Sequence, residues 1–393
     1  MSGAALATLV VAALASLFMA WAIGAGSSGS TPFAPAVGAN AITVMRAGFV
    51  VGILGLAGAV FQGANVSEAV GKELVVGVTL SPPAATTALL TAAVLVAIGV
   101  FAGYPIATAF TVTGAVVGTG LAMGGAPAWP KYQQIATLWV LVPFVGGGIA
   151  YATARTLRDL DADDVVVPLL GGVVGAIVAN IQFVFLGPSG VSRSVALAAA
   201  AEVGRNEFAV QVAATLALAA VVAAALRRDV VRDAERGQRH FLLALGGLVA
   251  FSAGGSQVGL AVGPLLPLVG NDVPLTYVLL GGGVGLLAGS WTGAPRMIKA
   301  LSQDYSSLGP RRSIAALIPS FAIAQTAVFL GIPVSFNEII VSGIVGSGYA
   351  AAGTAGGGVS KRKMLFTVLA WVASLALAFA VSYAAFSAVE TLF

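Results

Sequence analysis

Cysteine is absent from this sequence of 393 residues, and histidine occurs once, as His240. The absence of cysteine excludes disulfide bonds, thiolate metal sites and cysteine catalysis. His240 lies in a basic loop with no second metal-ligating residue at a useful spacing. No nucleophile, base and acid set and no nucleotide-binding loop is visible either. We therefore expect no catalytic residues, no metal site and no resident cofactor, which argues against an enzyme.

Charged residues are also scarce. Asp, Glu, Lys and Arg make up 9% of the chain and apolar residues 58%, whereas a typical soluble domain carries roughly 25% charged residues. So few charges cannot cover the surface of a soluble protein of this size, and the same numbers exclude disorder. Residues 74–130 contain no charge at all, and a membrane span needs about 20 apolar residues. The composition predicts an all-α polytopic membrane protein.

The apolar runs predict about twelve transmembrane segments, several of them interrupted by Gly, Pro or Ser. They are residues 4–23, 48–63, 83–102, 105–123, 134–154, 166–186, 208–226, 241–262, 273–291, 313–330, 333–352 and 365–386.

Twelve alternating crossings place 15 of the 19 basic residues on one side of the membrane. The four basic residues on the other side are Lys72, Lys131, Arg193 and Arg205. The positive-inside rule makes the first side cytoplasmic, so both termini are predicted to be extracytoplasmic. The net charge of +4 is then explained by loop residues that set the topology, and we expect no nucleic-acid partner.

The two ends of the chain share a pattern of spacings. Gly24 begins a Gly/Ser-rich break and precedes Pro105 by 81 residues, while Gly254 begins a similar break and precedes Pro333 by 79. We predict repeat 1 at residues 1–154, repeat 2 at 241–393, and connecting spans with an Arg-rich cytoplasmic loop at 155–240. Seven crossings, an odd number, separate equivalent spans, so the repeats are inverted. Inverted repeats with broken or re-entrant helices are typical of secondary transporters.

Four segments are expected to carry the breaks: residues 24–38, 103–113, 254–264 and 331–342. Irregular backbone at membrane depth is tolerated only when it is buried in protein or lines a wet cavity. The breaks are therefore expected to meet around a central site, where half-helix N-termini suit an anion and oxygens suit a small cation. The alternative is that the Gly and Ser residues only allow tight helix packing.

At these four segments the chain resembles the inorganic phosphate transporter (PiT) family. GAGSSGSTPFAPAVG and AGGSQVGLAVGPL are similar to that family's two GANDVAN-type motifs. PIATAFTVTGAVVGTG and PVSFNEIIVSGIVGSG are similar to its PVSTTHALVGAxxGxG motif. The resemblance covers roughly residues 19–385. It implies import of phosphate across the cytoplasmic membrane, coupled to sodium or protons, and it suggests a homodimer.

The resemblance implies site residues where the motifs match. In the family the PVSTT hydroxyls contact phosphate, and the Asn and Asp of the GANDVAN-type motifs hold sodium. No Asp remains in either GANDVAN-type motif here. The candidates for substrate binding are Thr108, Ser335, Asn337 and Ser256, and those for cation or proton coupling are Ser27, Ser30, Gln257 and Glu338.

Glu338 stands inside an otherwise apolar span, at the position where the family has His. A charge at the bilayer centre is costly, about 2.5–3.5 kcal/mol on insertion scales, so intramembrane carboxylates are functional candidates. Our hypothesis is that Glu338 carries a proton or binds a cation. The alternative is a structural carboxyl group that bonds to the facing backbone.

The leading hypothesis is a secondary active transporter of inorganic phosphate that lies in membrane lipid and works by alternating access with Na⁺ or H⁺. Sulfate or another oxyanion is the alternative substrate. An uncoupled anion channel and a homologue that has lost transport are the alternatives from other classes, because the motifs have diverged.

Overall fold

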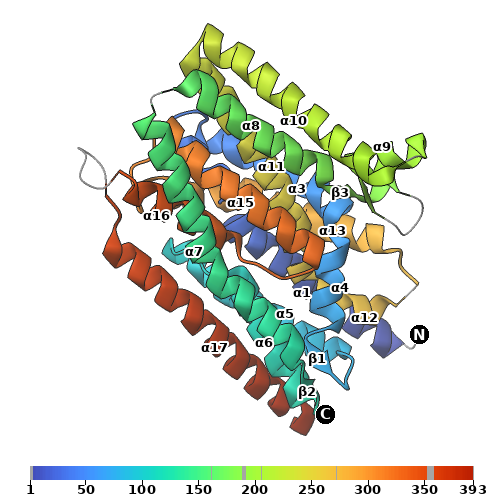
Figure 1. Ribbon diagram of the computed structural model, residues 1–393. Coiled ribbons are helices and arrows are strands. Elements are labelled where there is room, and N and C mark those ends of the chain that lie inside the picture. The colour runs from blue at the N-terminus through green and yellow to red at the C-terminus, as the bar shows by residue number, and fades with distance from the viewer. Residues whose placement is uncertain are drawn as a thin grey trace.

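The computed structural model describes residues 3–160, 162–187, 192–204, 206–270, 272–351 and 358–392. Arg205, one of the four basic residues assigned to the minority side, lies outside these residues. Helices make up most of the described chain (Figure 1). The two small sheets are antiparallel pairs, β1 (Val75–Val76) with β2 (Ala126–Pro127) and β3 (Gln182–Phe183) with β4 (Arg193–Ser194). The predicted all-α polytopic fold is confirmed.

Within the described residues, ten helical segments are long and apolar enough to cross a membrane. They are α1 (Gly3–Ile23) with its π-helical extension η1 (Gly24–Ser28), α3 (Val44–Gln62), α5 (Pro82–Ala102), α7 (Trp129–Asp159), α8 (Asp163–Asn180), α10 (Glu207–Arg232), α11 (Ala234–Val262), α13 (Leu275–Thr292), α15 (Pro310–Leu330) and α17 (Lys361–Leu392). Short elements connect them: α2 (Ala34–Gly38), α4 (Ala64–Lys72), η2 (Val184–Leu186), α9 (Val195–Val203), η3 (Gly263–Leu265), α12 (Leu266–Val269) and α14 (Ala294–Gln303).

Two of the twelve predicted spans are shorter helices. In place of 105–123 and 333–352 the structure has α6 (Thr108–Ala122) and α16 (Phe336–Tyr349). The preceding helices end at glycines in the left-handed conformation, Gly103 and Gly331, and a proline without an N–H group follows each of them closely. A helix of 15 residues is about 22 Å long, less than the roughly 30 Å hydrocarbon core. Both helices therefore begin inside the protein.

The prediction of a helix break at 254–264 is wrong for most of that segment. Helix α11 runs unbroken to Val262, and only the short 3₁₀ turn η3 follows it. Its glycines allow close packing instead, because a Cβ on Gly254 would lie 1.9 Å from the carbonyl oxygen of Gly55. The break at 24–38 is real, since α1 passes into the π-helical turn η1 and then into a short helix.

Helices α3 and α13, which the repeat pattern makes equivalent, run in opposite directions. Gly52 near the start of α3 lies against Trp291 at the end of α13, and Leu56 farther along α3 lies against Gly283. Two equivalent hydrogen bonds also cross between the halves, one in each direction. The indole N–H of Trp139 on α7 donates to the carbonyl of Pro333 at 2.9 Å, and that of Trp371 on α17 donates to the carbonyl of Pro105 at 2.8 Å. These relations support the division into 1–154, 155–240 and 241–393, which stays a prediction.

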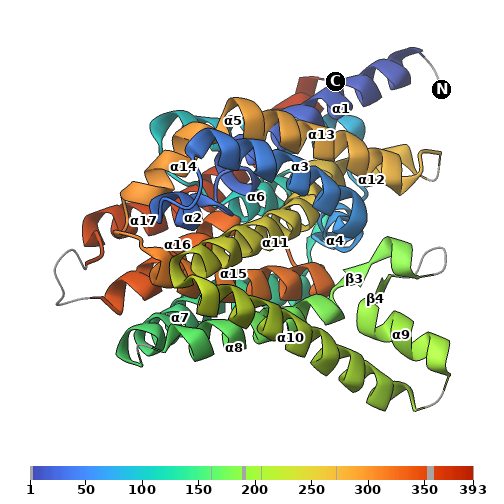
Figure 2. The ribbon, with the colours of Figure 1, turned by 90° about the horizontal axis from the view of Figure 1, so that it is seen from above.

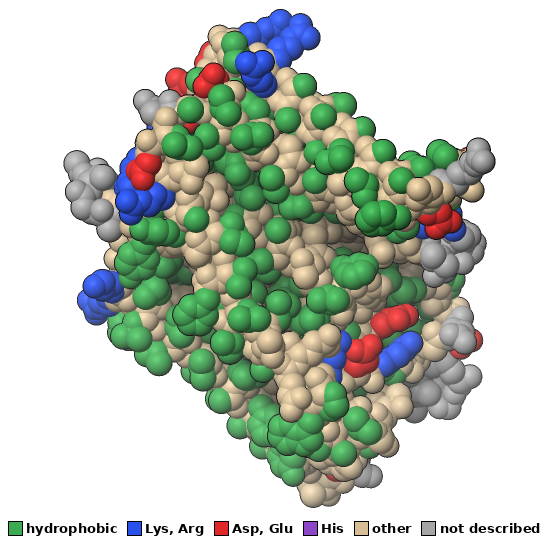
Figure 3. Space-filling view, in the orientation of Figure 1, with side chains coloured by type: hydrophobic (Ala, Val, Ile, Leu, Met, Phe, Trp, Pro, Cys, Tyr) green, Lys and Arg blue, Asp and Glu red, His purple; other side chains and the backbone are tan. Residues whose placement is uncertain are grey.

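The connecting helices α8 and α10 pack against each other along one side of the helical core (Figure 2). Only Leu226 and Val230 are buried among the described residues of α10. Hydrophobic side chains are spread over the face seen in Figure 3, and most of its charged side chains lie toward the margins. Such a surface matches a lipid environment, and the chain is a multi-pass membrane protein.

Candidate functional site

A buried network of polar side chains joins three elements that are far apart in the sequence. The Oε1 atom of Gln257 on α11 accepts hydrogen bonds from Ser27 Oγ of η1 at 3.2 Å and from Thr108 Oγ1 of α6 at 2.7 Å. The two hydroxyl oxygens lie 3.4 Å apart. All three residues have no exposed surface. The broken end of α1 and the start of α6 therefore meet at one amide group.

The fourth segment, at the start of α16, joins the same network. Gln257 Nε2 donates to the carbonyl of Val334 at 2.7 Å. Asn337 Nδ2 donates to the carbonyls of Gly26 at 2.9 Å and Ile106 at 2.6 Å. Each of these two amide side chains therefore links the two halves of the chain. The structure thus brings together Ser27, Thr108, Gln257 and Asn337 from the predicted set.

Several buried polar atoms near this network have no hydrogen-bond partner among the described residues. They include Ser335 Oγ, Asn337 Oδ1, Glu338 Oε2 and Ser256 Oγ. Most buried polar atoms in proteins are paired, and leaving one unpaired costs about 1–3 kcal/mol. Since serine hydroxyls donate hydrogen bonds and amide oxygens accept them, a polar ligand could satisfy these atoms.

Two helix N-termini also reach this region. Helices α6 and α16 begin at Thr108 and Phe336, and within the described chain neither has a side-chain N-cap. The first backbone N–H groups of a helix lack partners inside the helix. They carry a partial positive charge that favours an anion. Because Asn337 in the first turn of α16 bonds to Ile106, two residues before α6, the two N-termini lie at the same network. This arrangement suits a small oxyanion.

Two predicted residues lie beside the network and are not bonded into it. Ser30 Oγ donates to the backbone carbonyl of Ser27 at 3.2 Å, and Thr31 Oγ1 donates to the same carbonyl at 3.0 Å. These bonds stabilise the turn that presents Ser27. Ser256 precedes Gln257 on α11, and no hydrogen bond from its side chain to another described residue is present.

Glu338 is the only Asp, Glu, Lys or Arg among the buried residues that the structure describes. It is 1% exposed and lies in the first turn of α16. The charged side chains of the neighbouring helices α7 and α15 fall within the first three or last five residues of those helices. In the described chain, no three His, Cys, Asp or Glu side chains are grouped closely enough to hold a metal ion.

Two buried tryptophans, Trp139 and Trp371, were not among the site residues predicted from the sequence. Trp139 stacks on Phe110 in the first turn of α6, with the ring centroids 3.8 Å apart, and it also bonds to Pro333. The repeat spacing could have located it, because Trp139 follows Pro105 by 34 residues and Trp371 follows Pro333 by 38. Both tryptophans hold the proline segments that lead into the site.

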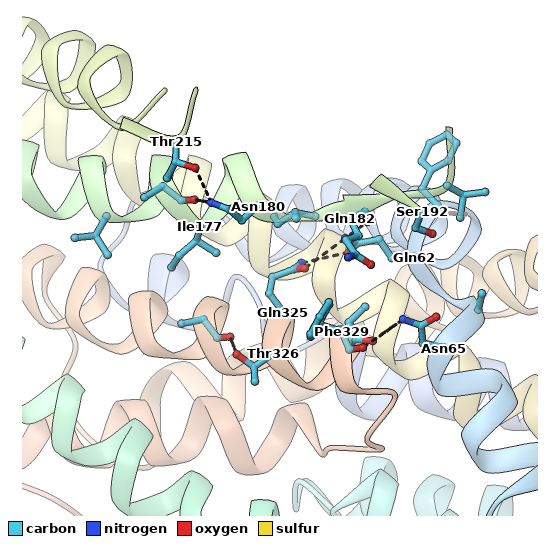
Figure 4. A pocket seen from close by; sticks show the side chains of 18 residues that line it. Gln62, Asn65, Ile177, Asn180, Gln182, Ser192, Thr215, Gln325, Thr326 and Phe329 are labelled. Carbon is cyan, nitrogen blue, oxygen red and sulfur yellow. Dashed lines mark hydrogen bonds between the residues drawn. The ribbon is translucent and has the colours of Figure 1, made fainter. Parts of the chain in front are cut away.

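A cavity of about 540 Å³ lies elsewhere, between α3, α4, α8, α10 and α15. Inside it the amides of Gln62 and Gln325 bond to each other at 3.2 and 3.3 Å, and Asn180 bonds to Thr215 at 3.0 Å (Figure 4). Most of its wall is apolar, and none of the network residues lines it. This cavity lies between the connecting helices and the core and is distinct from the candidate site.

Comparisons with known proteins agree with this geometry. A protein of Pyrococcus horikoshii that bears the name of a phosphate permease is 26% identical over 390 residues, which cover 92% of each chain. The chloroplastic inorganic phosphate transporter 2-1 of Arabidopsis thaliana is 26% identical over 85% of this chain and 64% of its own. A solved structure titled as the sodium-dependent phosphate transporter has the same fold, with a TM-score of 0.80, 22% identity and coverage of 98% of this chain and 100% of its own.

The family assignment follows from the sequence pattern of the phosphate transporter family, which matches residues 23–382. The matched region contains all four segments of the network. These relatives are transporters and permeases, so the prediction that the chain is not an enzyme is confirmed. The chain belongs to the phosphate transporter family.

Proposed function

We propose that this chain is a secondary active transporter of inorganic phosphate. The observation that carries the proposal is the buried network, where two helix N-termini and unpaired polar atoms meet inside a membrane protein. Phosphate offers several acceptor oxygens and negative charge, which match backbone N–H groups and serine and threonine hydroxyls. Family membership and the names of the relatives support the same substrate.

Substrate binding is assigned to the α6 and α16 N-termini together with Thr108, Ser335, Asn337 and Ser256. Thr108 contributes a hydroxyl that now bonds to Gln257, and Ser335 contributes a buried hydroxyl that is unpaired among the described residues. Asn337 already uses its N–H groups on two carbonyls, so its role is to position the segments around the anion.

The burial of the site supports alternating access. Ser27, Thr108 and Gln257 have no exposed surface, so phosphate reaches them only when the protein rearranges. Two inverted halves that meet at one site offer two related arrangements, one open to each side of the membrane.

The coupling cation is Na⁺ or H⁺, and Ser27, Ser30, Gln257 and Glu338 are the residues that we assign to it. Sodium would be held by hydroxyl and carbonyl oxygens near Ser27 and Gln257. A proton would be carried by Glu338, whose Oε2 atom is buried and unpaired within the described chain. The expected location is the cytoplasmic membrane, with both termini extracytoplasmic and the chain surrounded by lipid as a homodimer.

Uptake of radiolabelled phosphate into proteoliposomes tests this function. An inward gradient of Na⁺ or of H⁺, imposed in turn, is expected to concentrate phosphate above its external level. Radiolabelled sulfate is the matched competitor. Accumulation of sulfate alone would replace phosphate as the substrate, and flux that only equalises concentrations would indicate an uncoupled channel.

A further inference from the structure

Two lysines at the starts of equivalent long helices make the same kind of ion pair. Lys131 is the third residue of α7, and its Nζ lies 2.8 Å from Glu73 Oε2. Lys363 is the third residue of α17, and its Nζ lies 3.1 Å from Asp304 Oδ2. Glu73 directly follows α4 and Asp304 directly follows α14. The pairs join residues that are 58 and 59 positions apart, so each half contains one pair.

A second hydrogen bond accompanies each ion pair. Tyr132 OH donates to the carbonyl of Leu74 at 2.6 Å, next to the first pair. Beside the second pair, the hydroxyls of Tyr305 and Thr367 lie 2.6 Å apart. Burial raises the pKa of Tyr305 well above its usual range, so this hydroxyl keeps its proton. The long helix of each half therefore also bonds to the residue that follows the acidic residue. This residue is Leu74 for α7 and Tyr305 for α17.

Each lysine also contacts the opposite half of the chain. Lys131 Nζ donates to the carbonyl of Gly331 at 3.3 Å, and Lys363 Nζ lies 4.2 Å from the ring centroid of Tyr104, a favourable cation–π distance. Gly331 lies four residues before Ser335, and Tyr104 lies four residues before Thr108. Each lysine therefore holds the segment that leads to a substrate residue.

The two clusters lie at opposite ends of the molecule. Helices α6 and α17 run parallel, because Gly114 packs against Leu375 and Gly118 against Phe379. The start of α17, with Lys363, is therefore at the end where α6 begins. The β1–β2 pair and the start of α7, with Lys131, are at the end where α6 stops, close to the C-terminus in Figure 1.

We propose that these two clusters are the gates of the transport cycle. The Lys131–Glu73 pair opens when the site faces the β1–β2 side, and the Lys363–Asp304 pair opens when the site faces the other side. The lysine side chains are 12% and 18% exposed, and their acidic partners are 53% and 44% exposed. Ion pairs with such exposed partners are weak, which suits a contact that breaks and forms again in every cycle. This inference rests on the proposed alternating access.

Cysteine labelling tests the gates directly, because the native chain has no cysteine. A single reporter, Ala107→Cys, replaces a side chain with no exposed surface beside Thr108. Its reaction with a membrane-impermeant maleimide is measured in right-side-out and inside-out vesicles without phosphate. Asp304→Asn is expected to speed labelling about two- to fivefold in one vesicle orientation, and Glu73→Gln by a similar factor in the other, as the loss of an exposed ion pair allows.

The matched control is Asp159→Asn, which removes an ion pair to Arg158 at 2.8 Å whose acidic side chain is also 44% exposed. It is expected to leave labelling unchanged in both orientations. Ala109→Cys is the second reporter if Ala107→Cys does not fold. Equal acceleration in both orientations, or no acceleration by either gate variant, would overturn the proposal.

Phosphate uptake by the same variants separates the two proposals. Side-specific labelling without any phosphate uptake by the native chain would retain the gates and remove the proposed substrate. Intact uptake with labelling that ignores Glu73 and Asp304 would retain the substrate and remove the gates.

Discussion

The two halves of the chain contribute different chemistry to one site. Within the hydrogen-bonded network the first half supplies hydroxyl groups, from Ser27 and Thr108, while the second supplies longer amide side chains, from Gln257 and Asn337. The buried carboxyl group of Glu338 also belongs to the second half. The symmetry of the fold is therefore not a symmetry of the site. The difference suggests that the second half fixes the geometry of the network and carries the coupling group, while the first half offers adaptable hydroxyls.

The largest effect is expected from Asn337→Leu. The substitution leaves the carbonyls of Gly26 and Ile106 without this donor, and each unpaired buried group costs about 1–3 kcal/mol, so phosphate uptake should fall by about 100-fold. Proteoliposome uptake, with the thermal unfolding midpoint as a check on folding, measures this. Asn65→Leu is the control, since Asn65 also donates to two carbonyls, at the end of α15 and away from the network. Similar losses of uptake in both variants would contradict a specific role for Asn337.

Glu338→Gln should have the next largest effect and bears on the coupling role of the second half. Accumulation driven by a proton gradient should fall about tenfold if the carboxyl group transfers the proton, while exchange of phosphate at equal concentrations continues. Uptake and exchange are measured in the same proteoliposomes across pH. Unchanged accumulation with an unchanged pH dependence would remove Glu338 from the mechanism.

Thr108→Val tests the contribution of a hydroxyl group from the first half. It removes the hydroxyl that bonds to Gln257 at 2.7 Å, and a lost hydrogen bond of about 1 kcal/mol predicts a roughly fivefold rise in the KM for phosphate. Thr108→Ser should restore the native value. The neighbouring Thr111→Val is the control, because Thr111 bonds only to the Ala107 carbonyl of its own helix among the contacts in the described chain. An equal change in both valine variants would count against a binding role.

The smallest effect is expected from Ser30→Ala. Ser30 shares its acceptor, the Ser27 carbonyl, with Thr31, so the turn keeps one side-chain donor. Uptake should change by less than about twofold. A loss as large as that of Thr108→Val would place Ser30 in the site itself.

Much of the fold could be predicted from the sequence, because charge is so costly in lipid. Stretches such as 74–130 have no charged residue, and this one contains the helices α5 and α6. The prolines at 105 and 333 marked two real interruptions. The glycines at 254–259 misled us, because the same residue type serves both a broken helix and close helix packing. Only the neighbouring backbone, here Gly55 and Val66, decides between these roles.

The site was partly predictable for a different reason. The motif resemblance pointed to Thr108, Gln257 and Asn337, which the structure joins through hydrogen bonds. The lysine clusters were not predicted, because each depends on contacts between three segments and no local spacing encodes them. Lys131 was noted as a basic residue on the minority side, but its contact with Gly331 required the folded chain.

The most direct measurement of the central claim is equilibrium binding of radiolabelled phosphate to the purified protein. The native chain should bind phosphate saturably, and the double variant Thr108→Val with Ser335→Ala should lose that binding. Thr326→Val, in the separate cavity of Figure 4, should bind like the native chain. Binding that survives the double variant, or disappears with Thr326→Val, would contradict a phosphate site between the two helix N-termini.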